Sequence, residues 1–166
     1  MSRSLARRMK TGRYHATLNR AFSQVLDGCA AREETWINET IRDLVLELAP
    51  NGHAHAFAVW DHDRLVGGMY GITLGAAFFG ESMFSNDTDG SKMALAWAVD
   101  HLVRTGFTLF DTQFLTPHLA SLGGVEIPRA VYHQRLHNAL EAPANIQKIP
   151  LENDPQAVVQ RITQMS

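Results

Sequence analysis

The stretch LVGGMYGITLGAAFFGESMFS, residues 65–85, is rich in apolar and aromatic side chains. A Leu-Gly turn divides it into two segments, residues 65–73 and 76–84, which we expect to be paired strands. A further apolar run at residues 57–60 precedes it across a short polar turn. Three strands with such short connections predict an antiparallel meander at the centre of the chain.

Helical periodicity dominates on both sides of this meander. Apolar residues recur every three or four positions, which predicts helices over residues 17–29, 33–48, 92–104, 116–122 and 128–141. Residues 107–114 predict a fourth strand. The order of these elements is typical of the α+β class, here a mixed sheet with a central antiparallel meander flanked by helices. Glycines 67 and 68 inside a strand indicate a bulge or a close approach of other backbone.

The composition is that of one globular domain. The chain has 166 residues, of which 45% are hydrophobic and 19% are charged, which excludes collagen-like, disordered and disulfide-rich chains. The single cysteine, Cys29, allows no internal disulfide, so we expect a reducing compartment and a cytoplasmic protein. No apolar run approaches the roughly 18 residues of a membrane span, so no membrane association is expected.

The first twenty residues carry six basic and no acidic side chains. We expect a basic N-terminal arm over residues 1–14, a main domain over 15–142 whose order of elements resembles the layout of acyltransferases, and a C-terminal tail over 143–166 that can end in a short helix. A basic segment on an otherwise acidic chain can bind the phosphate backbone of a nucleic acid. The alternatives are a frayed, solvated terminus and a transit peptide. The candidate nucleic-acid-binding residues are Arg3, Arg7, Arg8, Lys10 and Arg13.

The segment Asp111-Thr112-Gln113 lies near the end of the fourth expected strand. Alternate side chains of a strand share a face, so Asp111 and Gln113 are expected to project together, roughly 7 Å apart. A carboxylate can accept a proton or orient an ammonium group, and an amide can both donate and accept. The alternative is a buried aspartate that is satisfied by backbone donors.

Other polar residues give weaker indications. Glu81 stands in an apolar segment and needs a partner or solvent, so it either holds a cationic group or lies on an outer face. His133 and His137 have the spacing of a helical metal chelate, but the sequence supplies no third ligand, and no metal is expected. A phosphate-binding glycine motif is missing, and the loop at residues 86–90 carries two acids that repel a pyrophosphate, so no cofactor is expected.

Taken together, several motifs resemble the leucyl/phenylalanyl-tRNA–protein transferase family. In chain order these motifs are Thr35-Trp36-Ile37, GHAH at 52–55, VGGMYG at 66–71, GESMFS at 80–85, Ser91-Lys92, Asp111-Thr112-Gln113, HLASLG at 118–123 and EIPR at 126–129. The resemblance extends from about Arg3 to Leu140. The VGGMYG and GESMFS blocks are its most specific part.

The resemblance implies an acetyltransferase-like (GNAT) fold and an enzyme whose acyl donor is aminoacyl-tRNA. Such enzymes transfer Leu, Phe or Met to proteins that begin with Arg or Lys and so mark them for degradation. It also implies that Asp111 and Gln113 form the reaction centre, with Glu81 beside them. The other substrate-binding residues implied are Met69, Phe78 and Met83 for the donor side chain, Trp36 for the terminal adenosine of the tRNA, and Ser85.

The physical character of these residues agrees with the resemblance. Methionines are flexible and suit a pocket that accepts unlike apolar side chains. We therefore expect the carboxylate of Asp111 to face Met69 and Met83 across one cavity.

This chain departs from the family pattern in two respects. Family members usually carry an additional N-terminal domain, which we expect to be largely absent from this chain, and Val45 stands where relatives often have tyrosine. Two other functions stay open: a binding remnant of the family, and a coenzyme A-dependent N-acetyltransferase on the same fold.

Overall fold

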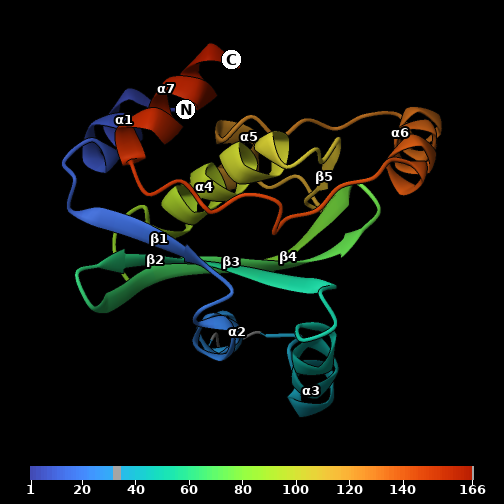
Figure 1. The fold of residues 1–166 in the computed structure, drawn as a ribbon, viewed down its shortest axis with the longest axis horizontal. Helices are drawn as coiled ribbons and strands as arrows, with labels where there is room; N and C mark the ends of the chain where they lie inside the picture. Colours follow the sequence, from blue (N-terminus) through green and yellow to red (C-terminus); the bar gives the residue numbers. More distant parts are fainter. Residues whose placement is uncertain (32–34, 166) are drawn as a thin grey trace.

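A five-stranded sheet forms the centre of the protein in the computed structural model, which describes residues 1–31 and 35–165 (Figure 1). In spatial order its strands are β1 (Tyr14–Leu18), β2 (Ala54–Asp61), β3 (Arg64–Leu74), β4 (Ala77–Ser85) and β5 (Leu109–Asp111). The first four pair antiparallel, and β5 pairs parallel to β4. The predicted meander is confirmed, and with it the α+β class.

Helices cover both faces of this sheet (Figure 1). On one side lie α2 (Phe22–Ala30) and α3 (Glu39–Leu48); on the other lie α4 (Gly90–Arg104), α1 (Arg3–Met9), α5 (Pro117–Ser121), α6 (Arg129–Glu141) and α7 (Pro155–Gln164). Helix α4 contacts β2, β3 and β4, while α1 and α7 pack on α4. None of the helices within residues 1–31 and 35–165 is long and apolar enough to cross a bilayer.

The predicted helix over residues 17–29 is wrong in its first part. Residues 14–18 form β1, which pairs with β2, and α2 begins only at Phe22. Tyr14 and Ala16 are buried while His15 is exposed, which is the two-residue period of a strand. The helical spacing of the following residues conceals this strand in the sequence. Residues 33 and 34 of the next predicted helix lie outside the described residues, and the prediction is wrong at residues 35–38, because α3 begins only at Glu39.

The predicted fourth strand is much shorter than expected. Only residues 109–111 pair with β4. Gln113 then adopts a φ of 66°, in the left-handed region that non-glycine residues rarely occupy. The expectation that Asp111 and Gln113 project from one strand face is therefore wrong, because the strand has ended before Gln113.

Glycines allow α4 to approach the sheet closely. A Cβ on Gly67 of β3 would lie 2.4 Å from the carbonyl carbon of Gly90, and a Cβ on Gly90 would lie 2.2 Å from the carbonyl oxygen of Val66. Of the two alternatives that the sequence leaves open at the glycine pair in β3, a bulge or a close approach of other backbone, the structure shows the close approach at Gly67. It brings the first turn of α4 beside the end of β4.

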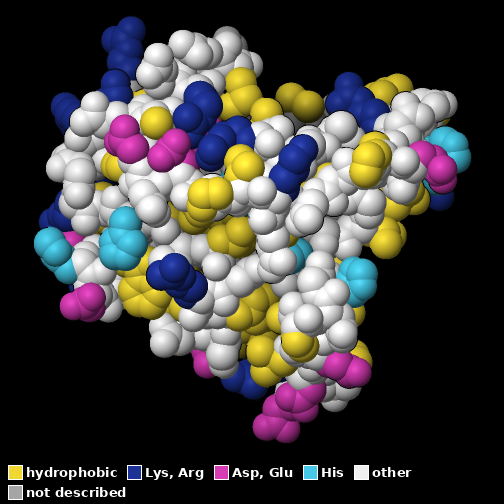
Figure 2. Space-filling model, in the orientation of Figure 1, with side chains coloured by type: hydrophobic (Ala, Val, Ile, Leu, Met, Phe, Trp, Pro, Cys, Tyr) yellow, Lys and Arg dark blue, Asp and Glu magenta, His cyan; other side chains and the backbone are white. Residues whose placement is uncertain are grey.

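Both ends of the chain pack on the α4 side of the sheet. Leu5 and Met9 of α1 and Val158 of α7 are buried in the same apolar cluster. Helix α7 lies where the sequence predicts a short final helix. Residues from the predicted arm and the predicted tail thus contribute to the core, while Lys and Arg side chains lie on the surface over α1 and α7 (Figure 2).

Candidate functional site

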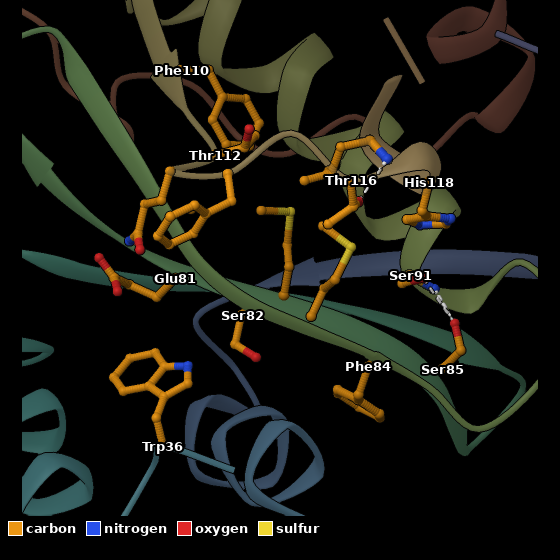
Figure 3. A pocket seen from close by; sticks show the side chains of 16 residues that line it. Trp36, Glu81, Ser82, Phe84, Ser85, Ser91, Phe110, Thr112, Thr116 and His118 are labelled. Carbon is orange, nitrogen blue, oxygen red and sulfur yellow. Dashed lines mark hydrogen bonds between the residues drawn. The ribbon is translucent and has the colours of Figure 1, made fainter. Parts of the chain in front are cut away.

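A cavity of about 780 Å³ opens between β4 and the segment that follows β5 (Figure 3). Its apolar lining comprises Trp36, Met69, Met83, Phe84, Phe110, Phe114 and Leu119. Its polar lining comprises Glu81, Ser82, Ser85, Ser91, Thr112, Gln113, Thr116 and His118. An apolar cavity with a few polar groups at its margin is the usual form of a small-ligand site.

Two methionines form the inner part of this cavity. Met69 of β3 and Met83 of β4 are directly paired in the antiparallel register, so their side chains lie on the same face of the sheet. Met69 is buried in the core, and Met83 packs against that core while remaining partly exposed. The pair can therefore adapt to apolar groups of different shape without disturbing the sheet.

Phe78 does not line the cavity, although the resemblance implies that it does. Its side chain is fully buried, and its ring meets that of Phe110 edge-on, with centroids 5.2 Å apart. Phe110 instead presents its ring to the cavity. The alternation of residues 107–114 could have predicted that Phe110 faces the cavity, since it places Phe110 and Thr112 on one face of the strand and Asp111 on the other.

Trp36 and Glu81 also line the cavity (Figure 3). Trp36 precedes α3, and 51% of its surface is exposed. Glu81 comes from the middle of β4 and is partly buried, and none of the described residues forms an ion pair with it. An exposed aromatic face and an unpaired carboxylate are thus both available to a ligand.

Ser85 joins the end of β4 to the first turn of α4 at the cavity wall (Figure 3). Its Oγ accepts a hydrogen bond from the backbone N–H of Ser91 at 2.8 Å and lies 2.9 Å from the Ser91 Oγ, to which it donates. These bonds fix the wall locally. Both hydroxyls already have a protein partner.

The acids of the neighbouring loop are paired within the protein. Arg64 binds Asp87 at 2.6 Å, while Lys92 and Arg8 bind Asp89 at 2.8 and 3.1 Å. Hydrogen bonds from Arg64 and Lys92 hold the pKa values of Asp87 and Asp89 below their usual range. The repulsion of a pyrophosphate that the sequence suggests is therefore offset by these cations.

Asp111 lines a second cavity, of about 820 Å³, next to the first. Its Oδ1 accepts the backbone N–H of Gln113 at 2.7 Å, and its Oδ2 accepts the hydroxyl of Tyr132 at 2.6 Å. The hydrogen bond to Asp111 raises the pKa of Tyr132 to about 12. Both carboxylate oxygens are therefore engaged within the protein.

The two cavities share a wall, and Gln113 belongs to it. The residues that line both are Phe110, Thr112, Gln113 and Phe114. The structure brings Gln113, Glu81 and the two methionines to the first cavity, but the carboxylate of Asp111 is not part of its lining. The reason is the turn after β5, which directs this carboxylate toward α6 instead of toward the methionines.

The five basic residues predicted to bind nucleic acid divide into two groups. Arg13 donates to Asp61 at 2.7 Å, and Arg8 is paired with Asp89. The remaining three are exposed, and the described part of the chain offers them no ion pair: Arg3, Arg7 and Lys10. Within residues 1–31 and 35–165, no three His, Cys, Asp or Glu side chains are grouped so as to hold a metal ion.

Known proteins resemble this chain over its whole length. The model of the leucyl/phenylalanyl-tRNA protein transferase family matches residues 1–137. Three curated proteins named leucyl/phenylalanyl-tRNA–protein transferase align with all 166 residues. The protein from Ruegeria pomeroyi is 60% identical over 79% of its own length, that from Roseobacter denitrificans 56% over 79%, and one from Cereibacter sphaeroides 55% over 78%.

Among solved structures, an aminoglycoside acetyltransferase from an uncultured soil metagenomic sample, in complex with sisomicin, is similar to 79% of this chain and 89% of its own. The TM-score is 0.49 and the sequence identity 11%. The relatives in sequence are decisive, because they align with all 166 residues of this chain at 55–60% identity. The chain belongs to the leucyl/phenylalanyl-tRNA protein transferase family, a family of aminoacyltransferases.

Proposed function

We propose that this protein transfers leucine, phenylalanine or methionine from aminoacyl-tRNA to the α-amino group of proteins that begin with Arg or Lys, which marks them for N-degron degradation. The observation that carries the proposal is the methionine-lined cavity with Trp36, Glu81 and Gln113 among its lining residues (Figure 3). An apolar aminoacyl side chain fits its inner part. The ester and the incoming amine would meet at the polar margin. The names of the relatives support the transfer of leucine or phenylalanine from tRNA to a protein.

The donor occupies the first cavity in this proposal. Met69 and Met83 contact its apolar side chain, and the exposed ring of Trp36 offers a stacking surface for the terminal adenine, as aromatic side chains do for unpaired bases. The unpaired cations Arg3, Arg7 and Lys10 are the candidates for contacts with tRNA phosphates. Arg8 and Arg13 contribute less, because each already binds an aspartate.

The reaction is aminolysis of an ester. The acceptor nitrogen attacks the ester carbon, a peptide bond forms, and the bond to the ribose oxygen breaks. The amine loses a proton and the ribose oxygen gains one. The unperturbed pKa of an α-amine, about 8, leaves a usable neutral fraction near pH 7. Since the ester is already activated, positioning is the main task of the protein.

Two polar residues would serve the acceptor. The side-chain amide of Gln113, in the wall between the cavities, orients the α-amine. The carboxylate of Glu81 attracts the basic side chain of the acceptor. Asp111 acts on the amine through Gln113, because its own oxygens bind the Gln113 backbone and Tyr132.

A labelled-transfer assay tests the proposal. The chain is incubated with radiolabelled Leu-tRNA and a protein that begins with Arg, with the same protein beginning with Ser as a control and labelled acetyl-coenzyme A in parallel. We expect label only from Leu-tRNA and only on the Arg protein. Retained tRNA binding without transfer would replace the proposal with a binding remnant, and transfer of acetyl alone would replace it with an N-acetyltransferase.

The role of Gln113 is tested by Gln113→Gly, because glycine keeps the positive φ and removes only the side-chain amide. We expect the transfer rate to fall about a hundredfold, the order of loss when a positioning group is removed from a reacting centre. The control is Gln160→Ala, an exposed glutamine on α7. If Gln113→Gly keeps the full rate, Gln113 is not part of the reaction centre. Asp111→Ala is likewise expected to abolish transfer while the chain stays folded.

A further inference from the structure

We propose that Tyr132 is a positioning residue for this reaction: through its hydrogen bond to Asp111 it holds the turn that keeps Gln113 in the wall between the two cavities. The inference rests on the proposed function and extends it to a residue on another element. Tyr132 belongs to α6, and Gln113 lies in the segment that follows β5.

The turn after β5 is built on the side chain of Asp111. Its Oδ1 accepts the N–H of Gln113 at 2.7 Å, which is the pattern of an Asx turn. The turn puts Gln113 at a φ of 66°, a conformation that a non-glycine residue keeps only when its surroundings hold it there. The orientation of the Asp111 carboxylate therefore determines where Gln113 lies.

Other elements give this segment little support: the hydrogen bond from the Phe114 N–H to the Thr112 carbonyl, at 2.7 Å, lies within the segment itself. Gln113 and Phe114 are exposed, Phe114 by 78%, and residues 115–118 are exposed as well. The Tyr132 hydroxyl, 2.6 Å from the Asp111 Oδ2, is the one side-chain hydrogen bond among the described residues that reaches Asp111 from a different element. Helix α6 packs against β4 and β5, so this hydroxyl ties the turn to a fixed support.

Loss of the hydroxyl leaves Asp111 free to turn toward solvent. The Asx turn then weakens, and Gln113 can leave the left-handed region and the cavity wall. Tyr132 itself lines only the second cavity, so the methionines and the donor contacts stay in place. The expected consequence is slower transfer with unchanged donor binding.

The variant Tyr132→Phe tests this, with Tyr70→Phe as its matched control. The Tyr70 hydroxyl is buried and has no hydrogen-bond partner among the described residues, so its removal deletes the same atom without losing a bond. With Leu-tRNA and the Arg protein, we expect Tyr132→Phe to lower kcat at least fivefold and to leave KM for Leu-tRNA within twofold. Tyr70→Phe should change neither. An unchanged kcat, or a rise in KM of the same size as the fall in kcat, would overturn the proposal.

Amide hydrogen exchange at Gln113, measured by NMR on the free protein, supplies a readout that needs no tRNA. Tyr132→Phe should speed this exchange several-fold, and it should add nothing in an Asp111→Ala background, because the effect passes through Asp111. An unchanged exchange rate at Gln113 in Tyr132→Phe would overturn the proposal that Tyr132 holds Gln113 in place. If the wild-type chain transfers no label, the proposed function fails by itself, and the exchange data still decide whether Tyr132 holds Gln113.

Discussion

Single side chains give the first cavity, the proposed donor site, its chemical character. Met69 is part of the buried core, so its replacement would disturb folding as well as binding. Met83 is partly exposed and borders the cavity, which makes it the better probe of ligand contacts. Met69 thus mainly supports the fold, whereas Met83 is placed to contact a ligand.

Met83→Gln keeps the length of the side chain and replaces an apolar surface with an amide. We expect KM for Leu-tRNA to rise about tenfold, because roughly 1.5 kcal/mol of apolar burial is lost on binding, while kcat changes little. The matched control is Met165→Gln, which alters a 49% exposed methionine beyond the end of α7. An unchanged KM would exclude Met83 from the donor contacts.

At the level of strands, a small group of charges joins the ends of β1, β2 and β3. Asp61 is buried at the end of β2. Its Oδ1 accepts from Arg13, which precedes β1, at 2.7 Å, and its Oδ2 accepts from Arg64 of β3 at 3.2 Å. Chiefly because of the hydrogen bonds from Arg13, the pKa of Asp61 falls from 3.8 to about 2.

A carboxyl group whose pKa is lower in the folded than in the unfolded chain stabilises the fold at any pH above its unfolded-state pKa. This stabilisation is lost as the pH falls through its folded-state pKa. For Asp61 this window runs from 3.8 down to about 2. We expect Asp61→Asn to be less stable than wild type at pH 7, with a difference that shrinks between about pH 4 and pH 2. Urea unfolding across this range measures it, and Asp63→Asn, an exposed neighbour in the same turn, is the control. A difference that stays constant down to the lower end of this window would contradict the assignment.

Across the whole molecule, the two ends of the chain meet over α4. Arg161 of α7 binds the buried Asp100 of α4 at 2.5 and 2.9 Å, and Arg104 lies 3.6 Å from the same carboxylate. Apolar contacts of α1 and α7 complete this layer. One side of the sheet is therefore covered by α4, and α4 in turn packs against residues from both ends of the sequence.

Arg161→Ala removes the main partner of a buried carboxylate. We expect the free energy of unfolding to fall by about 3 kcal/mol, since a buried charge loses most of its compensation. Gln160→Ala, an exposed position in the same helix, should change it by less than about 0.5 kcal/mol. Urea denaturation compares the two. Equal stabilities of the two variants would show that α7 is held by its apolar contacts alone.

Local pattern was enough to predict the centre of this fold. The apolar runs and short turns of residues 57–85 specify the meander, and the register of that meander places Met69 beside Met83. These features depend on neighbours in sequence. The family could be recognised for the same reason, since its motifs are short and contiguous.

Contacts between segments far apart in the sequence determined the remaining features of the fold and of the site. Strand β1 pairs with β2, about forty residues later, and its own five residues are too few to predict it beside the helical spacing that follows them. Phe110 lines the cavity where Phe78 was expected, because the side chain of Phe78 is buried in the core and packs against the Phe110 ring. Asp111 lies apart from the methionines because its carboxylate binds a tyrosine 21 positions further along the chain. Which groups meet the ligand therefore depended on hydrogen bonds and packing that no short stretch of sequence contains.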